Sequence, residues 1–390
     1  MTFIFNAASN TVGGGVQTAT NFILLTLELE KSCASWQYFI SPQIAYNLQS
    51  LGVDPENDRR FMVVPVSPAR SYAARKKLSR KIDMLSPKLV YTMSGPAYIR
   101  ISSPHVMGCS NAYISHAKLG QYFELGVKKG FIKLLESFFK FSHIHRCDHL
   151  IFQTTTARYG FLKRSFWPLK RTSVVPNALG HSFVKTFSTP LMRSRRCPSL
   201  ERPLLILVPS AGYKHKNLDI VLPIAKILDG RYPGLFRFVM TLPEGRDWNN
   251  IQIDARKAGL ESVIVNIGPF NVAEAPGIYI DSDLMFLPTQ LETFSASYLE
   301  AMWCGLPIVT SDLPFAHEIC GPAAVYVDTK SAQACSMVLA KFLTDEDMFD
   351  NLVNAGNEQV LSFPNLKQRY TNIVNFLIEF SKQRDAGNKL

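Results

Sequence analysis

The 390-residue chain lacks the features that mark several common classes of protein. No apolar run approaches the roughly 18–20 residues that a membrane-spanning helix needs. Residues 1–20 show no basic stretch before an apolar core, so we expect no secretory signal. The seven cysteines are odd in number, scattered and without a CxxC pair, which favours reduced thiols in a cytoplasm over disulfides or a zinc site. The length and the 47% apolar content indicate a globular protein of two domains.

Acidic residues are scarce in the first half of the chain. Residues 1–180 contain 22 Lys and Arg against 9 Asp and Glu, a net charge of +13, whereas residues 181–390 contain 20 and 22, a net charge of −2. This asymmetry predicts an anionic partner for the first half, such as a membrane surface, a nucleic acid or a phosphorylated substrate. The sequence has no basic strand interleaved with aromatic residues and no recognition-helix motif, so we do not expect nucleic acid.

Two stretches concentrate the positive charge. Residues 75–81 hold five cations in seven positions, and residues 127–141 form an amphipathic helical pattern. The second pattern has apolar residues on one face and lysines on another: Phe131, Leu134, Leu135 and Phe138 against Lys129, Lys133 and Lys140. Such a helix either packs its apolar face on a core or lies on an anionic lipid surface. The large local excess of charge favours the lipid surface.

Short apolar segments alternate with helix-like segments along the whole chain. The expected strands are 2–5, 37–40, 61–66, 88–93 and 148–154 in the first half, and 204–209, 236–243, 263–270, 284–287 and 308–310 in the second. We expect 148–154 to be the last strand of the first half. The alternation predicts an α/β protein with parallel, doubly wound sheets.

Residues 283–328 contain the clearest local pattern. The apolar run 284–287 stops at Pro288 and suits a strand buried on both faces. A short helical run, 298–304, is closed by Gly305, and a second strand starts at Ile308. Any of Thr293, Ser295 and Ser297 could cap the helix. A tight strand-to-helix turn of this kind directs free N–H groups and the positive end of a helix dipole at its ligand, for which phosphate is the natural choice.

Two glutamates frame this turn. Glu292 lies just before the helix and Glu300 within it, with seven residues between them. Carboxylates are unsuited to a phosphate, but they accept strong hydrogen bonds from the hydroxyls of a ribose or another sugar. Taken alone, the pair could equally be two surface glutamates near a helix start.

In its full setting the pattern resembles a known family. The segments Glu292-Thr-Phe-Ser, Leu299-Glu-Ala-Met, Cys304-Gly-Leu-Pro-Ile-Val and Ser311-Asp, in this order, resemble the donor-site signature of the family 4 retaining glycosyltransferases. The resemblance implies a GT-B fold, in which two Rossmann-like doubly wound domains face a cleft. Residues 1–176 would bind the acceptor, residues 177–365 would bind a nucleotide-sugar donor, and a helix in 366–390 would cross back to the first domain.

The resemblance also implies a set of site residues. We expect His105, Lys216 and Glu292 to be catalytic, and the donor to be bound by Gly14, Gly15, Lys216, Asn217, Gly268, Glu292, Thr293, Phe294, Ser295 and Glu300. In the family a lysine and an arginine bind the donor diphosphate. Lys216 matches the lysine, but Ala211 stands where the arginine would be. Diphosphate binding would then fall to Lys216, the backbone N–H groups and Lys214.

The expected site residues of the first half depend on looser evidence. Gly13, Gly14 and Gly15 lie between a strand and a helix, where they would let a ligand approach the backbone closely, although a plain flexible turn suits them as well. They do not form the GxGxxG fingerprint of dinucleotide-binding proteins. His105 follows an apolar–polar alternation, where a strand should meet the cleft. It would contact the transferred sugar, as family members do, or be satisfied by local hydrogen bonds.

The reaction implied is sugar transfer with retention, by front-face attack within an ion pair. Lys216 and the helix N-terminus would neutralise the departing diphosphate, so no metal and no cofactor is expected. Asp281 and Asp283 resemble the metal motif of another glycosyltransferase class, but we expect them to be structural. A basic first half suits a lipid-linked saccharide acceptor on an anionic membrane. This predicts a cytoplasmic protein, peripheral on the inner face of the membrane, that acts in surface polysaccharide, O-antigen or lipopolysaccharide assembly.

Two other functions remain open at this point. A nucleotide-sugar 2-epimerase on the same fold would need no second sugar and should act on the donor alone. A non-catalytic nucleotide-sugar-binding module would keep the fold without transfer. The presence of Lys216, Glu292 and Glu300 argues against the binding module, and the missing arginine argues for it.

Overall fold

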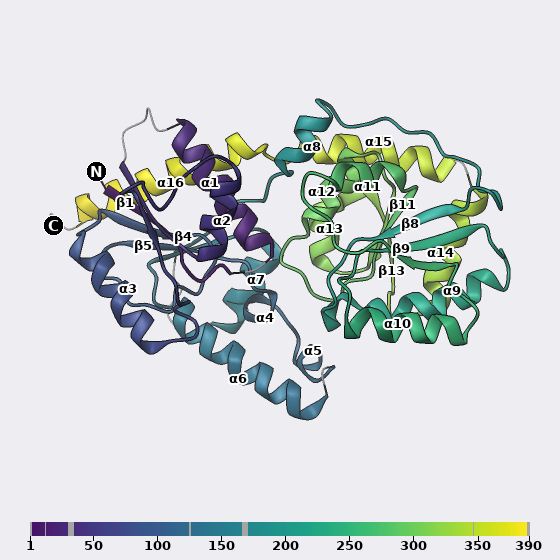
Figure 1. Ribbon diagram of the computed structural model, residues 1–390, viewed down its shortest axis with the longest axis horizontal. Helices are drawn as coiled ribbons and strands as arrows, with labels where there is room; N and C mark the ends of the chain where they lie inside the picture. The colour runs from purple at the N-terminus through teal and green to yellow at the C-terminus, as the bar shows by residue number, and fades with distance from the viewer. Residues whose placement is uncertain are drawn as a thin grey trace. The chain divides into compact units, whose positions relative to one another are not determined.

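The computed structural model describes residues 2–11, 13–29, 35–124, 126–165, 171–345 and 347–387. The chain divides into two compact units (Figure 1). Unit 1 comprises Met1–Pro176 with Lys367–Leu390, and unit 2 comprises Asn177–Leu366. The boundaries expected from the sequence lie after residues 176 and 365.

Unit 1 is built on a seven-stranded sheet in the order β3-β2-β1-β4-β5-β6-β7, and all of its pairings are parallel. The strands are β1 (Thr2–Ala7), β2 (Ser35–Ile40), β3 (Phe61–Val63), β4 (Leu89–Thr92), β5 (His105–Cys109), β6 (His149–Phe152) and β7 (Arg171–Val174). The prediction that 148–154 is the last strand of this half is wrong. Residues 171–174 add a seventh strand because they pair with β6, although their sequence, Arg-Thr-Ser-Val, is too polar to indicate a buried strand.

Helices cover both faces of this sheet, and each face has its own apolar core. They are α1 (Gly14–Leu29), α2 (Pro42–Ser50), α3 (Tyr72–Met84), α4 (Ala112–Ser115), α5 (Leu119–Phe123), α6 (Val127–Ile144), α7 (Thr155–Arg164) and α16 (Leu366–Gly387). The last of these comes from the C-terminal end of the chain. Its residues Tyr370, Ile373, Val374, Leu377 and Phe380 join the same core as Phe5 and Phe22, so the C-terminal helix completes unit 1.

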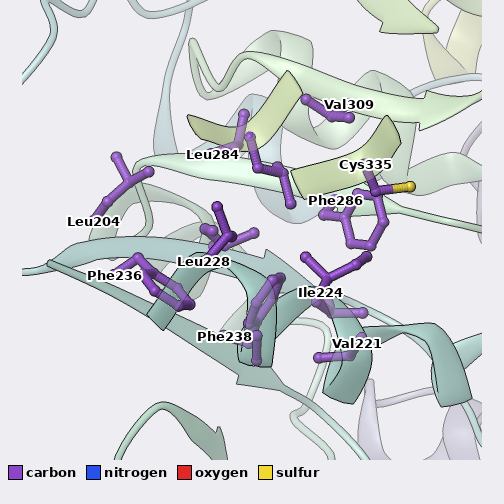
Figure 2. Close-up of a cluster of buried hydrophobic side chains, with 14 of the residues drawn as sticks. Leu204, Val221, Ile224, Leu228, Phe236, Phe238, Leu284, Phe286, Val309 and Cys335 are labelled. Atoms are coloured by element: carbon purple, nitrogen blue, oxygen red, sulfur yellow. The ribbon is translucent and has the colours of Figure 1, made fainter. Parts of the chain in front are cut away.

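Unit 2 is built on a six-stranded parallel sheet in the order β10-β9-β8-β11-β12-β13. Its strands are β8 (Leu204–Val208), β9 (Phe236–Met240), β10 (Ile264–Asn266), β11 (Leu284–Leu287), β12 (Ile308–Ser311) and β13 (Ala324–Val327). As expected, β11 is buried on both faces. Leu284 and Phe286 enter one core with Phe238 and Ile224 (Figure 2), while Met285 and Leu287 enter the opposite core.

The helices of unit 2 follow the strands in regular alternation. They are α8 (His181–Thr186), α9 (Val221–Asp229), α10 (Arg246–Lys257), α11 (Ala275–Asp281), α12 (Ala296–Trp303), α13 (Pro314–Cys320), α14 (Ala332–Thr344) and α15 (Asp347–Leu361). Three short 3-10 turns, η1 (Lys214–Lys216), η2 (Leu218–Ile220) and η3 (Gly321–Ala323), complete the unit. The predicted parallel, doubly wound α/β architecture is confirmed in both units.

Each sheet reverses its winding direction at one point. In unit 1 this lies between β1 and β4, and in unit 2 between β8 and β11. The loops that follow two such strands run in opposite directions across the carboxyl edge of the sheet, and ligands of doubly wound proteins bind there. The fold therefore favours ligand binding at the loop after β1 in unit 1 and at the loops after β8 and β11 in unit 2.

Helix α6 exposes its apolar face, whereas an amphipathic helix that packs on a core buries that face. The side that packs inward carries Gly130, Ser137 and Ile144, and an added Cβ at Gly130 would lie 2.6 Å from the backbone oxygen of Tyr122 in α5. The large apolar side chains point outward: Val127, Phe131, Ile132, Leu135, Phe138 and Phe139 are 42–79% exposed. The small residues allow close helix packing, so the apolar stripe is left as a surface.

The cations around α6 fall into two groups. Lys133 and Lys140 lie 3.5 and 3.8 Å from the carboxylate of Glu136, and Lys133 also lies over the ring of Tyr113. Lys128 and Lys129 are exposed in the first turn, where positive charge is unfavourable to the helix dipole. Helix α3 adjoins α6 through Arg75, whose guanidinium lies over the rings of Tyr98 and Phe139. The exposed apolar stripe is therefore flanked by lysines of α6 and by the basic helix α3.

Candidate functional site

Lys216 and Glu292 lie in the loops that follow two neighbouring strands of unit 2. Lys216 ends the 3-10 turn η1 after β8, and Glu292 lies between β11 and α12. Since β8 and β11 are adjacent and parallel, both loops emerge at the carboxyl edge of the sheet, where its winding reverses. The structure thus brings together two predicted residues that stand 76 positions apart in the sequence.

The two side chains form an ion pair. The ammonium of Lys216 bonds to Oε1 of Glu292, and the side chains are 16% and 15% exposed. Partial burial makes such a pair stronger than a surface ion pair, because solvent screens it less. Both charges nevertheless remain reachable from solvent, so a ligand that carries its own charges and hydroxyls can compete for them.

Asn217 holds the turn that presents Lys216. Its backbone is in the left-handed region, with φ of 57°, where asparagine is better tolerated than most residues. Its side-chain amide donates to the backbone oxygen of Thr329 at 2.6 Å. The side chain of Asn217, which the resemblance placed in the donor site, therefore anchors the loop to the chain segment that follows β13.

The loops after β8 and β11 are also tied to each other. The N–H of Gln290 donates to the backbone oxygen of His215 at 2.7 Å, and the hydroxyl of Thr289 reaches the same oxygen at 3.3 Å. The hydroxyl of Ser311, at the end of β12, donates to the backbone oxygen of Thr289 at 2.7 Å. These bonds hold Lys216 and Glu292 in a fixed relation.

The N-terminus of α12 follows directly. Ser295 is its N-cap residue, but its side chain makes no capping hydrogen bond. The N–H of Tyr298 bonds to the backbone oxygen of Ser295 at 3.3 Å, whereas those of Ala296 and Ser297 are open to an anion. Thr293 and Ser295 are only 5% and 8% exposed, and Phe294 packs edge-on against Phe363 with ring centroids 5.9 Å apart. These three residues would serve a ligand through their backbone, since their side chains are largely buried.

Glu300 occupies the second turn of α12 and is partly buried. Its Oε2 accepts a hydrogen bond of 2.7 Å from the hydroxyl of Tyr279, which comes from α11. Burial raises the pKa of the Glu300 carboxyl above its ordinary value, and the bond from Tyr279 partly offsets this. The sequence did not point to Tyr279 as the partner of Glu300. Its segment, Ala-Pro-Gly-Ile-Tyr, gives no signal beyond a tyrosine in a helix.

Gly268 lies just beyond β10, two strands away from β8 at the same edge of the sheet. It has a φ of 75°, which suits glycine alone among common residues, and an added Cβ there would meet no atom within 4 Å. Its loop is held by Asn266, whose side chain pairs with the backbone of Leu242 at 2.8 and 2.9 Å. Gly268 is therefore a fixed, open backbone position.

The predicted glycines of unit 1 lie after β1, beside the point where that sheet reverses. Gly13 has a φ of 67°, and Gly14 and Gly15 open α1. Asn10 braces this turn, because its side-chain amide donates to the backbone oxygen of Gly15 at 3.1 Å. An added Cβ at Gly14 would meet no atom within 4 Å, so space for a close ligand approach exists at this position.

The expected place of His105 is wrong. The alternating residues before it form no strand, and Pro104 instead precedes a strand that begins at His105. All strands of the sheet point the same way, so the start of β5 faces away from the edge that carries the glycine turn. The His105 side chain is 1% exposed, and its Nε2 lies 2.8 Å from the hydroxyl of Thr92. His105 is a buried residue with local hydrogen bonds rather than a contact for the transferred sugar.

The remaining candidates have partners inside unit 2. Lys214 pairs with Asp219. The carboxylate of Asp283 accepts a bond of 3.0 Å from the N–H of Leu205, which is the structural role expected for it. Within the described ranges no group of three or more His, Cys, Asp and Glu could hold a metal ion. Among the cysteines, Cys109, Cys147, Cys197, Cys304, Cys320 and Cys335 are free thiols, whereas Cys33 lies outside the described residues.

The arrangement of the two sheets defines the fold class of this protein. Two Rossmann-like units with parallel sheets of seven and six strands form the GT-B fold. Residues 194–359, which lie in unit 2, match the family model of glycosyl transferases group 1. This range contains Lys216, Glu292 and Glu300.

Individual proteins support this placement. A 107-residue stretch is 28% identical to a D-inositol 3-phosphate glycosyltransferase of Corynebacterium jeikeium, and it covers 27% of this chain and 25% of that protein. The match therefore spans about a quarter of that relative. A glycosyltransferase from Rickettsia africae superposes with a TM-score of 0.70 at 12% identity, covering 97% of this chain and 98% of the other. The Anabaena protein Alr3699/HepE, solved with UDP and glucose, gives 0.67 at 12% identity, covering 96% and 98%. At such identity, the structures show the common fold.

Along the described parts of the chain, no helix has both the length and the apolar character that crossing a bilayer requires.

Proposed function

We propose that this protein is a retaining glycosyltransferase of family 4 that transfers a sugar from a nucleotide-sugar donor to a lipid-linked saccharide. The observation that carries the proposal is the Lys216–Glu292 pair beside the open N-terminus of α12, at the edge where the unit 2 sheet reverses. One cation, free N–H groups and one carboxylate suit a ligand with a diphosphate joined to a hydroxyl-rich group.

Donor binding would exchange the partners of this ion pair. The diphosphate would take the ammonium of Lys216 and the N–H groups at the start of α12, while the sugar hydroxyls would donate to Glu292. Each hydrogen bond to a charged group contributes about 1.5–3 kcal/mol. Glu300, within α12, would accept from the hydroxyls of the ribose, and Gly268 would bring its open backbone to the nucleobase.

The transfer itself would depend on charge neutralisation. As the bond between the sugar and the diphosphate breaks, negative charge develops on the leaving phosphate, and Lys216 with the α12 dipole would stabilise it without a metal ion. No carboxylate is assigned as a covalent nucleophile, and attack would come from the face that the diphosphate leaves. In unit 1, the glycine turn at Gly14 and Gly15 would let a substrate approach the backbone closely.

The exposed apolar stripe of α6 supports a membrane-associated acceptor. Phe131, Leu135 and Phe138 are 56%, 56% and 66% exposed, and basic side chains of α6 and α3 flank them. A helix with this combination lies in the interface of an anionic bilayer, apolar side down. The protein would thus work as a peripheral enzyme on the inner face of the cytoplasmic membrane, in polysaccharide or lipopolysaccharide assembly.

A binding screen tests the proposal. Purified protein is titrated with UDP, GDP, ADP and their sugar conjugates, and thermal unfolding is followed. A ligand at about 100 times its dissociation constant should stabilise the fold by about 2.7 kcal/mol. Lys216→Met should abolish this gain, whereas Lys226→Met, at an exposed position of α9, should keep it. Failure of every nucleotide to bind would refute the proposal, and release or epimerisation of the sugar in the absence of an acceptor would favour an epimerase.

A further inference from the structure

We infer that Tyr279 is a positioning residue for nucleotide recognition, because its hydroxyl holds Glu300 so that the other carboxylate oxygen faces the ribose hydroxyls of a bound nucleotide. This inference rests on the proposed function, which places a nucleoside diphosphate in unit 2.

The geometry of the contact fixes one oxygen of Glu300. The Tyr279 hydroxyl donates to Oε2 at 2.7 Å, and within the described residues the structure shows no bond to Oε1. A carboxylate accepts at both oxygens, so Oε1 remains to take a hydrogen bond from a ligand. Glutamate carries considerable rotamer freedom, and a side chain that is already held loses less entropy when a ligand binds.

Tyr279 is itself rigidly held. Its side chain is fully buried, and its ring packs edge-on against Phe183 with centroids 5.5 Å apart. A guanidinium N–H of Arg193 reaches its backbone oxygen at 3.4 Å. Burial first, and then the charge of Glu300, raises the pKa of Tyr279 well above its ordinary value. The phenol therefore stays protonated, and the direction of the bond is set: Tyr279 donates and Glu300 accepts.

The groups around Glu300 leave Tyr279 as its main polar contact. The thiol of Cys304, the C-cap residue of the same helix, has its own pKa raised to about 12, mainly by burial and further by Glu300. Arg193 lies near Cys304 and interacts with it. Ser297, also in α12, acts on Tyr279, whose pKa it lowers. Of these neighbours, only Tyr279 favours the ionised form of Glu300.

A bond that only joined α11 to α12 would affect stability alone, so the test measures recognition of the ribose. The nucleotide that binds best among UDP, GDP and ADP is compared with its 2′,3′-dideoxy analogue by calorimetry. Tyr279→Phe should weaken the ribonucleotide about 3- to 10-fold, the range of one hydrogen bond, and leave the dideoxy analogue unchanged. Tyr326→Phe, which removes a hydroxyl bonded to the backbone oxygen of Gly321, is the matched control and should alter neither affinity.

The pH profile gives a second readout. Without its donor, Glu300 should take up a proton at higher pH, so the acid loss of ribonucleotide affinity should move upward in Tyr279→Phe. Titration of the phosphates is common to both proteins and cancels in the comparison. In the Glu300→Gln background, Tyr279→Phe should change neither the affinity nor its pH profile, because no carboxylate remains to be positioned.

The outcomes separate the two hypotheses. If the wild type binds no nucleotide, the proposed function fails. If it binds, but Tyr279→Phe weakens both nucleotides equally, leaves the pH profile in place, or still acts in the Glu300→Gln background, the inference is overturned. Should Tyr279→Phe fail to fold, a difference in ribonucleotide affinity between Glu300→Gln and the double variant still overturns the inference, since neither contains a carboxylate deprived of its donor.

Discussion

The ammonium of Lys216 and the carboxylate of Glu292 pair across the loops that follow β8 and β11, with 16% and 15% of the side chains exposed. The pair keeps two opposite charges in place before any ligand arrives, so a donor would meet a preformed site. It also sets a condition for binding, because a ligand must replace with its own groups the interaction that it breaks. A diphosphate that carries a sugar can replace both partners, because its phosphate oxygens can pair with Lys216 and its sugar hydroxyls can donate to Glu292.

Replacing Glu292 or Glu300 by glutamine should impair different steps of the reaction. Glu300→Gln should mainly weaken binding of the free nucleoside diphosphate, because its partner would be the ribose. Glu292→Gln should bind that nucleotide nearly normally but transfer sugar about 10- to 150-fold more slowly, since its partner would be on the sugar. Calorimetry with the nucleotide and turnover at saturating donor separate the two. The opposite pattern would mean that the roles are reversed.

Glu300→Gln should also stabilise the fold at neutral pH. The pKa of Glu300 is raised in the folded protein, so the native state holds this proton more tightly than the unfolded chain does, and ionisation costs stability. That cost is complete above the folded pKa and disappears as the pH falls through the ordinary range of glutamate. The thermal midpoint of Glu300→Gln should therefore exceed that of the wild type at pH 8, and the difference should shrink toward pH 4. A variant less stable than the wild type at pH 8 would contradict this.

The exposed stripe of α6 should direct the protein to anionic liposomes. Replacing Phe131, Leu135 and Phe138 together by serine should remove most of the binding, since each buried side chain of this size contributes about 1.5–3 kcal/mol. Lys128→Glu with Lys129→Glu should weaken it at low salt, and the difference should fade as the Debye length shrinks from about 10 Å at 0.1 M to about 3 Å at 1 M. Sedimentation with vesicles measures both effects.

Control variants for the membrane test are available in unit 2. Ile253 and Met337 are 51% and 63% exposed on α10 and α14, and replacing them by serine should leave vesicle binding unchanged. Equal sedimentation with neutral vesicles, unaffected by salt, would exclude the electrostatic part of the hypothesis.

Chelation should not abolish transfer. If Lys216 and the α12 dipole neutralise the diphosphate, activity should survive EDTA. Asp283→Ala should unfold more easily, because it leaves the N–H of Leu205 without its acceptor, at a cost of about 1–3 kcal/mol. Asp281→Ala, at an exposed position, should keep both stability and activity. A complete loss in EDTA that magnesium restores would overturn the metal-free mechanism.

Gly14→Ala should raise the stability of the fold while it lowers the turnover of the enzyme. The structure leaves room for a methyl group there, and alanine in place of glycine in a helix stabilises by about 0.4–1 kcal/mol. If a ligand approaches this backbone, turnover should fall about 10- to 100-fold, as expected when a bound group is displaced by roughly 1 Å. For comparison, an added Cβ at Gly108 would lie 2.0 Å from the backbone oxygen of Met93, so Gly108→Ala should damage the fold itself. Full activity in Gly14→Ala would mean that no ligand approaches closely at this position.

Local pattern by itself determined much of this protein. The alternation of apolar segments with helical ones predicted both parallel sheets, and the run from Leu284 to Ser311 predicted one strand–helix–strand unit in the right place. The order of the residues around Glu292 and Glu300 indicated a glycosyltransferase, and residues 194–359 match the model of glycosyl transferases group 1. These features depend on residues that are close together in the chain, so they can be read directly from the sequence.

Only the tertiary structure decided which surfaces and groups meet. Periodicity showed that α6 has an apolar face, but not that its small residues would pack inward and leave that face exposed, because the choice depends on how closely α5 approaches Gly130. His105 was assigned to the wrong end of a strand, since the strand's limits follow from its pairing with β4 and β6. The contact of Tyr279 with Glu300 joins two helices across 21 residues, and it exists because α11 and α12 pack together on one face of the unit 2 sheet.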